Sequence, residues 1–96
     1  MTDAAYIAAR LSVAMPRAVR LRFALYQANL HALKEAGLDA GTAHKAAAVA
    51  TQTTRLSSTK DLDPELQQVL KRWLEGVSNE HIAQLAAIWD KQSAKS

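Results

Sequence analysis

Apolar residues recur three or four positions apart along most of the chain, which is the spacing of one face of an α-helix. The clearest example follows Asp63-Pro64-Glu65, which combines a capping residue, a first-position proline and an acid in the first turn. No stretch alternates apolar and polar residues with the enrichment in Val, Ile and Thr that is typical of a strand, so we expect no strands. The apolar positions after this start signal are Leu66, Val69, Leu70, Trp73, Leu74 and Val77.

Prolines and glycines divide the pattern into separate helices. A first helix begins after Thr2 and ends or kinks at Pro16, which is well placed as the first residue of the next helix. Gly37 ends this second helix, and Gly76 ends the helix that begins at Pro64. The predicted helices after the first cover residues 16–36, 42–55, 64–76 and 79–92.

The helix over 16–36 carries two apolar stripes, and a helix with two apolar faces has two surfaces to pack against. One interpretation buries both stripes in the middle of the bundle. The other leaves the second stripe for a partner or a second copy, with an arginine at the rim of the interface. We expect the second stripe to be this interface, because its small residues let another helix approach closely. The first stripe comprises Val19, Phe23, Tyr26, Leu30 and Leu33; the predicted interface comprises Leu21, Arg22, Leu25, Ala28 and Ala32.

The helix over 42–55, capped by Asp39 or Thr42, is rich in alanine, which forms helix readily but buries little area. Its small residues favour close approach to a neighbouring helix. The hydroxyl-rich segment 51–60 is expected to fray the end of this helix into a loop, because hydroxyl side chains compete for backbone hydrogen bonds.

The short connection at 76–78 predicts an antiparallel pair of the last two helices, with Trp73 and Trp89 in its apolar layer. Residues 92–96 are expected to form a frayed tail. With 96 residues, the chain can bury one core without a metal or a disulfide. The predicted fold is therefore a single domain over 1–96 of the all-α class: a small irregular bundle of four to five helices with a C-terminal antiparallel pair.

Composition limits both the environment and the chemistry. The chain has no cysteine, which excludes disulfides and thiolate sites. No apolar run approaches the roughly 20 residues that cross a bilayer, so we expect a cytoplasmic protein without a membrane partner. The three histidines lie on three predicted helices and form no short metal-binding pair. The carboxylates occupy helix caps and exposed faces, so the sequence predicts no catalytic residue, cofactor or metal and no enzymatic activity.

The formal net charge is +3, and the whole excess lies in residues 1–48. A basic first half suits an anionic partner. Cations along the polar stripe of the helix over 16–36, joined by those of segment 51–60, could follow a phosphate backbone, so DNA or RNA binding is the alternative function. Ala24 and Glu35 dilute this stripe. The predicted nucleic-acid contacts are Arg17, Arg20, His31, Lys34, Lys45, Arg55 and Lys60.

Two short segments resemble known regulators. The run GVSNEHIAQL over 76–85 resembles the start of the scaffold helix in LuxR-type helix-turn-helix domains, although we expect no recognition helix after Trp89. Segments 36–39 and 56–62 are similar in rhythm to the Mu-type phage GemA-like regulators, which implies a regulator from a mobile element. Neither resemblance supplies functional residues.

We therefore expect a non-enzymatic interaction or regulatory protein that acts through protein–protein contacts, as an adaptor or inhibitor of bacterial, phage or plasmid origin. We also expect it to form a homodimer through the second stripe. DNA or RNA binding remains the alternative.

Overall fold

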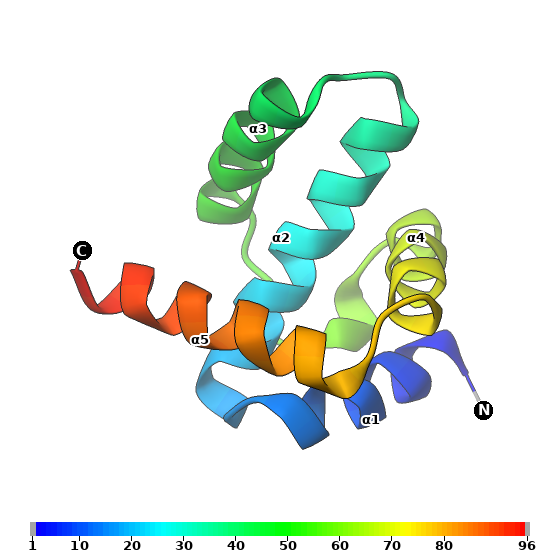
Figure 1. The fold of residues 1–96 in the computed structure, drawn as a ribbon. Coiled ribbons are helices and arrows are strands. Elements are labelled where there is room, and N and C mark those ends of the chain that lie inside the picture. The colour runs from blue at the N-terminus through cyan, green and yellow to red at the C-terminus, as the bar shows by residue number, and fades with distance from the viewer. Residues whose placement is uncertain (1, 96) are drawn as a thin grey trace.

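The computed structural model describes the backbone of residues 2–95, and their side chains except for those of Ala18 and residues 92–95. Within these residues the chain forms five α-helices, one 3₁₀ turn (η1) and no strand (Figure 1), which confirms the predicted all-helical bundle. The Cα radius of gyration of 12.4 Å is that of a compact chain of this length. The elements are α1 (Asp3–Ala14), α2 (Arg17–Glu35), α3 (Ala40–Thr53), η1 (Thr59–Asp61), α4 (Pro64–Glu75) and α5 (Asn79–Lys95).

Local capping groups set most of these boundaries. Thr2 caps α1, its side-chain oxygen accepting a hydrogen bond from the amide of Ala5. Pro16 separates the two helices, as predicted, but it is the residue before α2 and not its first residue, because its backbone is extended. Gly37, with φ of +103°, adopts a backbone conformation after α2 that side-chain-bearing residues rarely adopt.

The boundaries of α3 and α5 differ from the predictions. The Asp39 carboxylate accepts hydrogen bonds from the amide and hydroxyl of Thr42, so α3 begins at Ala40 rather than at 42, and it ends at Thr53. The predicted frayed tail at 92–96 is wrong as far as the structure describes it, since the backbone of α5 remains helical through Lys95. Ser96 lies outside the described residues.

The loop between α3 and α4 is more ordered than a frayed helix end. The carboxylate of Asp61 accepts hydrogen bonds from the Ser57 amide and hydroxyl and from the Ser58 amide. The hydrogen bonds from Ser57, followed by that from Ser58, lower the pKa of Asp61. These contacts fold the segment into a turn that leads into η1.

Helix α2 lies at the centre of the bundle and packs against α1, α3, α4 and α5. The ring of Phe23 lies 6.3 Å from Trp73 of α4 and 6.4 Å from Trp89 of α5, measured between ring centroids. The largest fully buried side chains, which form the core around it, are Phe23, Ile7, Leu11, Leu70, Leu74 and Ile82.

Helices α4 and α5 follow one another through a short turn, but they do not run side by side as an antiparallel pair. Both pack against α1 and α2, and their backbones diverge after the turn (Figure 1). Phe23 lies near the tryptophans of both helices, so the two helices share the core rather than a direct interface. No helix within residues 2–95 has both the length and the apolar character needed to span a bilayer.

One arginine holds the turn between α4 and α5 against α1. The guanidinium of Arg10 donates hydrogen bonds to the carbonyl oxygens of Leu74 and Val77, to the hydroxyl of Tyr6 and to the side-chain oxygen of Asn79. A planar guanidinium has five N–H donors in fixed directions, which allows one side chain to serve all four acceptors. Arg10 therefore fixes the point from which α5 starts.

Candidate functional site

The stripe predicted as the protein interface is mostly covered by the chain itself. Leu25 is 4% exposed and Ala28 is 0% exposed, while Leu21 and Ala32 are half-buried. Four helices surround α2, so both of its apolar stripes pack inside the bundle, as the alternative interpretation of the pattern predicted. This stripe is therefore not a free face. Of the five predicted interface residues only Arg22 is exposed.

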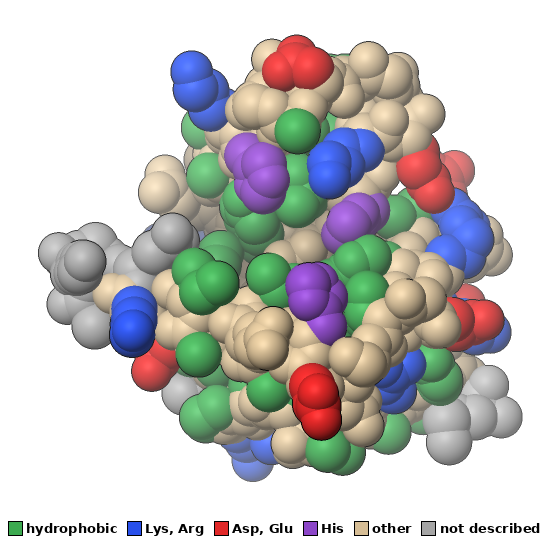
Figure 2. Space-filling model, viewed as in Figure 1, with side chains coloured by type: hydrophobic (Ala, Val, Ile, Leu, Met, Phe, Trp, Pro, Cys, Tyr) green, Lys and Arg blue, Asp and Glu red, His purple; other side chains and the backbone are tan. Residues whose placement is uncertain are grey.

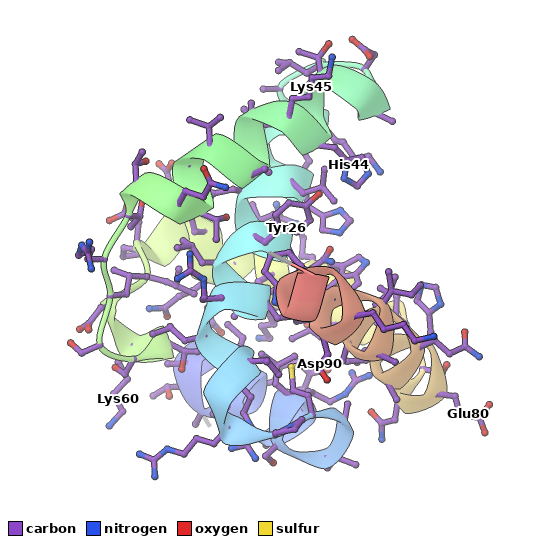
Figure 3. All side chains as sticks on the ribbon, turned by 90° about the vertical axis from the view of Figure 1, so that its left-hand side faces the viewer. Tyr26, His44, Lys45, Lys60, Glu80 and Asp90 are labelled. Carbon is purple, nitrogen blue, oxygen red and sulfur yellow. The ribbon has the colours of Figure 1, made fainter. Side chains whose placement is uncertain are left out.

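The surface that is open lies beside this stripe, between α3 and α5. Both helices pack against α2 but not against each other, and a cleft of about 640 Å³ separates them. Part of α2 forms its floor. In Figure 3, which faces this side of the molecule, Tyr26 and His44 point toward one another above the helix that carries Asp90. The walls are formed by His44, Ala48 and Gln52 of α3 and by Leu85, Ile88 and Trp89 of α5. We call this cleft the α3–α5 groove.

Aromatic rings make up much of the groove's surface. The ring of Tyr26 lies 4.9 Å from Trp89 and 6.0 Å from His44 between centroids, and its hydroxyl is hydrogen-bonded to His44 Nδ1. Phe23 meets Trp89 edge to face, at an interplanar angle of 89°. Burial raises the pKa of Tyr26, so the phenol is neutral near pH 7. The rings therefore form a packed apolar floor, which carries one polar hydroxyl–imidazole pair.

One aliphatic side chain in the groove wall is exposed to solvent. Among the described residues, the large hydrophobic side chains with substantial exposure are Val13 (71%), Val49 (61%) and Ile88 (54%). Only Ile88 lines the groove. An exposed aliphatic that lines the same cleft as aromatic rings is typical of a binding site, whereas isolated exposed residues are common on any protein.

A second hollow of about 380 Å³ continues the groove toward the end of α3. Arg22, Thr51 and Gln52 line both hollows, and the second also includes Arg55 and Leu56. Among the residues whose side chains the structure describes, no carboxylate lines either hollow, and neither guanidinium forms an ion pair with a carboxylate. The groove is therefore apolar and aromatic at one end and cationic at the other. We call Arg22 and Arg55 the arginine pair.

The other predicted nucleic-acid contacts do not form one surface. Lys45 and Lys60 lie at opposite ends of the molecule (Figure 3). Arg20 donates a hydrogen bond from its Nε to the carbonyl of Met15, 3.0 Å away, where α1 ends. Arg17 and Lys34 are exposed near opposite ends of α2, a helix roughly 28 Å long. Of the predicted set, only Arg55 lines either hollow, and it lines the second one.

His31, also predicted as a nucleic-acid contact, is packed inside the structure. Its ring stacks on Trp73 with 5.0 Å between centroids and 25° between planes. Its Nε2 is buried and has no hydrogen-bond partner among the described residues. Burial lowers the pKa of His31, and the positive charge of Lys34 lowers it further. A neutral, stacked imidazole is a packing group rather than a phosphate contact.

The three histidines, although they come from three helices, gather on one face of the molecule (Figure 2). They are not close enough to share an ion: the described residues contain no group of three potential metal ligands. His44 contributes to the groove, as described above, and the amide of His81 donates a hydrogen bond to the hydroxyl of Ser78. Helix capping therefore accounts for Ser78 in the segment that resembles a LuxR-type scaffold helix.

Comparison with protein-family models, with curated proteins and with solved structures gave no match for this chain. The groove as a whole was not predicted from the sequence: Arg22 was assigned to the protein interface, while its other residues were assigned to the core or to no binding surface. A usable signal does exist on α3, where His44, Ala48, Thr51 and Gln52 recur on one helix face. A second signal is Ile88, an aliphatic residue beside the apolar face of α5.

Proposed function

We propose that the chain is a non-enzymatic interaction protein that binds a segment of a partner protein in the α3–α5 groove, as an adaptor or inhibitor would. The observation that carries the proposal is that the exposed Ile88 lines the same cleft as the packed rings of Tyr26 and Trp89. A helical segment that lays an apolar face into such a groove is a common mode of peptide recognition.

The dimensions of the groove support a short helix as the bound segment. The wall residues on α3 run from His44 to Gln52, a rise of roughly 12 Å, or about two helical turns. A helix of two to three turns offers three apolar side chains on one face, at positions i, i+3 or i+4, and i+7. The groove volume of about 640 Å³ lies within the range of ordinary ligand sites.

The DNA- or RNA-binding alternative has weaker support. Its predicted contacts are scattered over the surface, and two of them, Arg20 and His31, already make internal contacts. The homodimer stays a prediction. Two of the residues proposed for its interface, Leu25 and Ala28, are buried within the chain, so a dimer would need another surface.

A library of displayed random peptides tests the proposal. Peptides selected on the wild-type chain are measured against Ile88→Glu, which places a charge in the groove, and against Val49→Glu, which changes an equally exposed aliphatic outside both hollows. Because both residues are more than half exposed, the free energy of unfolding of each variant should lie within roughly 0.5 kcal/mol of the wild-type value.

We expect Ile88→Glu to weaken binding by about tenfold or more, which corresponds to about 1.4 kcal/mol, while Val49→Glu changes it less than about twofold. A selection that yields no peptides, or peptides that tolerate both substitutions equally, would contradict the proposal. Sedimentation of the wild type and Ile88→Glu tests self-association. A dimer lost in Ile88→Glu would make a second copy the partner, whereas a strict monomer would contradict the predicted homodimer.

A further inference from the structure

The α3–α5 groove is apolar at one end and positively charged at the other, and its apolar surface alone does not explain the charged end. Arg22 comes from α2 and Arg55 from the loop after α3, yet the fold brings both to the same hollow. Arg22 lines both hollows and so lies where the apolar part of the groove meets the cationic part. Two cations brought together without a carboxylate repel each other, which a bound anionic group would relieve.

We infer that the occupant of the groove is an acidic amphipathic helix, whose apolar side chains pack against Tyr26, Ile88 and Trp89 and whose carboxylates pair with Arg22 and Arg55. The inference rests on the proposed function and adds to it the chemistry of the partner. Arginine is suited to this role, because its planar guanidinium forms paired hydrogen bonds with a carboxylate.

The overall charge favours such a partner over a second copy of the chain. The formal net charge is +3, so two copies repel each other at a distance, while an acidic segment is attracted. The aromatic floor favours a peptide over a nucleic acid. The rings of Tyr26 and Phe23 already pack against Trp89, and Tyr26 also packs against His44. The exposed side chain of the groove wall is Ile88, an aliphatic residue that cannot stack with a base.

The spacing of the groove defines the probe. Arg22 lies one helical turn before Tyr26 on α2, or roughly 6 Å along the axis, so the carboxylates should lie about one turn beyond the end of the apolar series that is nearer Arg22. A fluorescein-labelled peptide of about 16 residues, with leucines at i, i+4 and i+7 and two glutamates one turn beyond, meets this requirement. A second peptide is identical except that two lysines replace the glutamates.

Binding is measured by fluorescence anisotropy at about 50 mM and about 500 mM salt, where screening weakens exposed ion pairs. We expect the glutamate peptide to bind about tenfold or more tightly than the lysine peptide at low salt, with a smaller difference at high salt. The double variant Arg22→Glu/Arg55→Glu should reverse this preference. Arg17→Glu/Lys45→Glu makes the same change in net charge outside both hollows and should preserve the preference.

The outcomes separate this inference from the proposed function. If both peptides bind equally and both are lost in Ile88→Glu, the groove binds peptides but the acidic partner is wrong. If neither peptide binds up to about 1 mM and no displayed peptide is selected, both the proposed function and the acidic partner are refuted. A mixed-sequence single-stranded oligonucleotide that displaces the peptide, with affinity that depends on Arg22 and Arg55, would overturn the inference in favour of a nucleic acid. A groove-dependent dimer would overturn it in favour of a second copy.

Discussion

Removal of the partly buried Arg10 guanidinium should destabilise the fold more than removal of an exposed positive charge such as that of Arg17. Arg10 donates to the carbonyls of Leu74 and Val77, which end α4 and form the turn into α5, with N···O distances of 2.5 and 2.7 Å. Arg10→Met keeps much of the aliphatic stem and removes every donor. The two carbonyls are partly buried and would lose this partner in the variant.

The magnitude follows from these two carbonyls. A hydrogen bond from a charged donor contributes roughly 1.5–3 kcal/mol, and a buried acceptor without its donor costs roughly 1–3 kcal/mol. Since both sites are only partly buried, we expect Arg10→Met to lower the free energy of unfolding by about 3 kcal/mol. In a domain of this size, that corresponds to a fall in Tm of about 12–24 °C. The free energy of unfolding of Arg10→Lys should lie between those of the wild type and Arg10→Met, because one ammonium cannot reach all four acceptors.

The assay is urea unfolding, followed by helical circular dichroism and by tryptophan fluorescence. Arg17→Met is the matched control: Arg17 is exposed, and the substitution should change stability by no more than about 0.5 kcal/mol. Equal m-values in all variants would show that the extent of unfolding is unchanged. An Arg10→Met protein within about 1 kcal/mol of the wild type would refute the reasoning, as would an Arg10→Lys protein of full stability.

Two further predictions concern backbone conformation and pH. Gly37→Ala should destabilise the protein by about 1 kcal/mol, because φ is +103° there. Gly41→Ala, at a position within α3 without positive φ, should stabilise it by about 0.5–1 kcal/mol. Thermal unfolding measures both, and shifts of the same sign would contradict one of the two predictions. Burial lowers the pKa of His31 from its ordinary 6.5, so below this pH the unfolded chain binds more protons and stability should decrease as the pH falls. His31→Phe keeps an aromatic ring on Trp73 and should flatten this part of the stability profile, and an unchanged slope would show that another group is responsible.

The helix boundaries could be predicted because each depends on one or two residues. Pro16 separates the first two helices, Gly37 follows the second, and Asp63 with Pro64 starts α4, all as expected. The error at the start of α3 arose between two good capping residues. Asp39 caps the helix because its carboxylate reaches both donors of Thr42, and a sequence pattern does not contain that geometry.

The packing of α2 could be predicted only in part. Its two apolar stripes were correctly identified, but a pattern gives the faces of a helix and not the number of helices that cover them. Leu25 and Ala28 were therefore assigned to a partner, whereas the chain's own helices bury them. The groove was missed for the same physical reason. It depends on where α3 and α5 lie on α2, which contacts between residues distant in the sequence determine.

The alanine-rich character of α3 accounts for the existence of the groove. Ala43 and Ala47 are 0% exposed and pack with Leu30, so α3 lies close against α2. On its next face α3 presents the small side chain of Ala48, which lines the open space between the two helices together with Ile88 of α5. A larger apolar side chain at this position would cover part of the exposed apolar surface of the groove, and burial of apolar surface stabilises a fold. The small residue that leaves the cleft open and the exposed aliphatic opposite it are both unfavourable for the isolated fold, and binding of a partner segment would compensate for both.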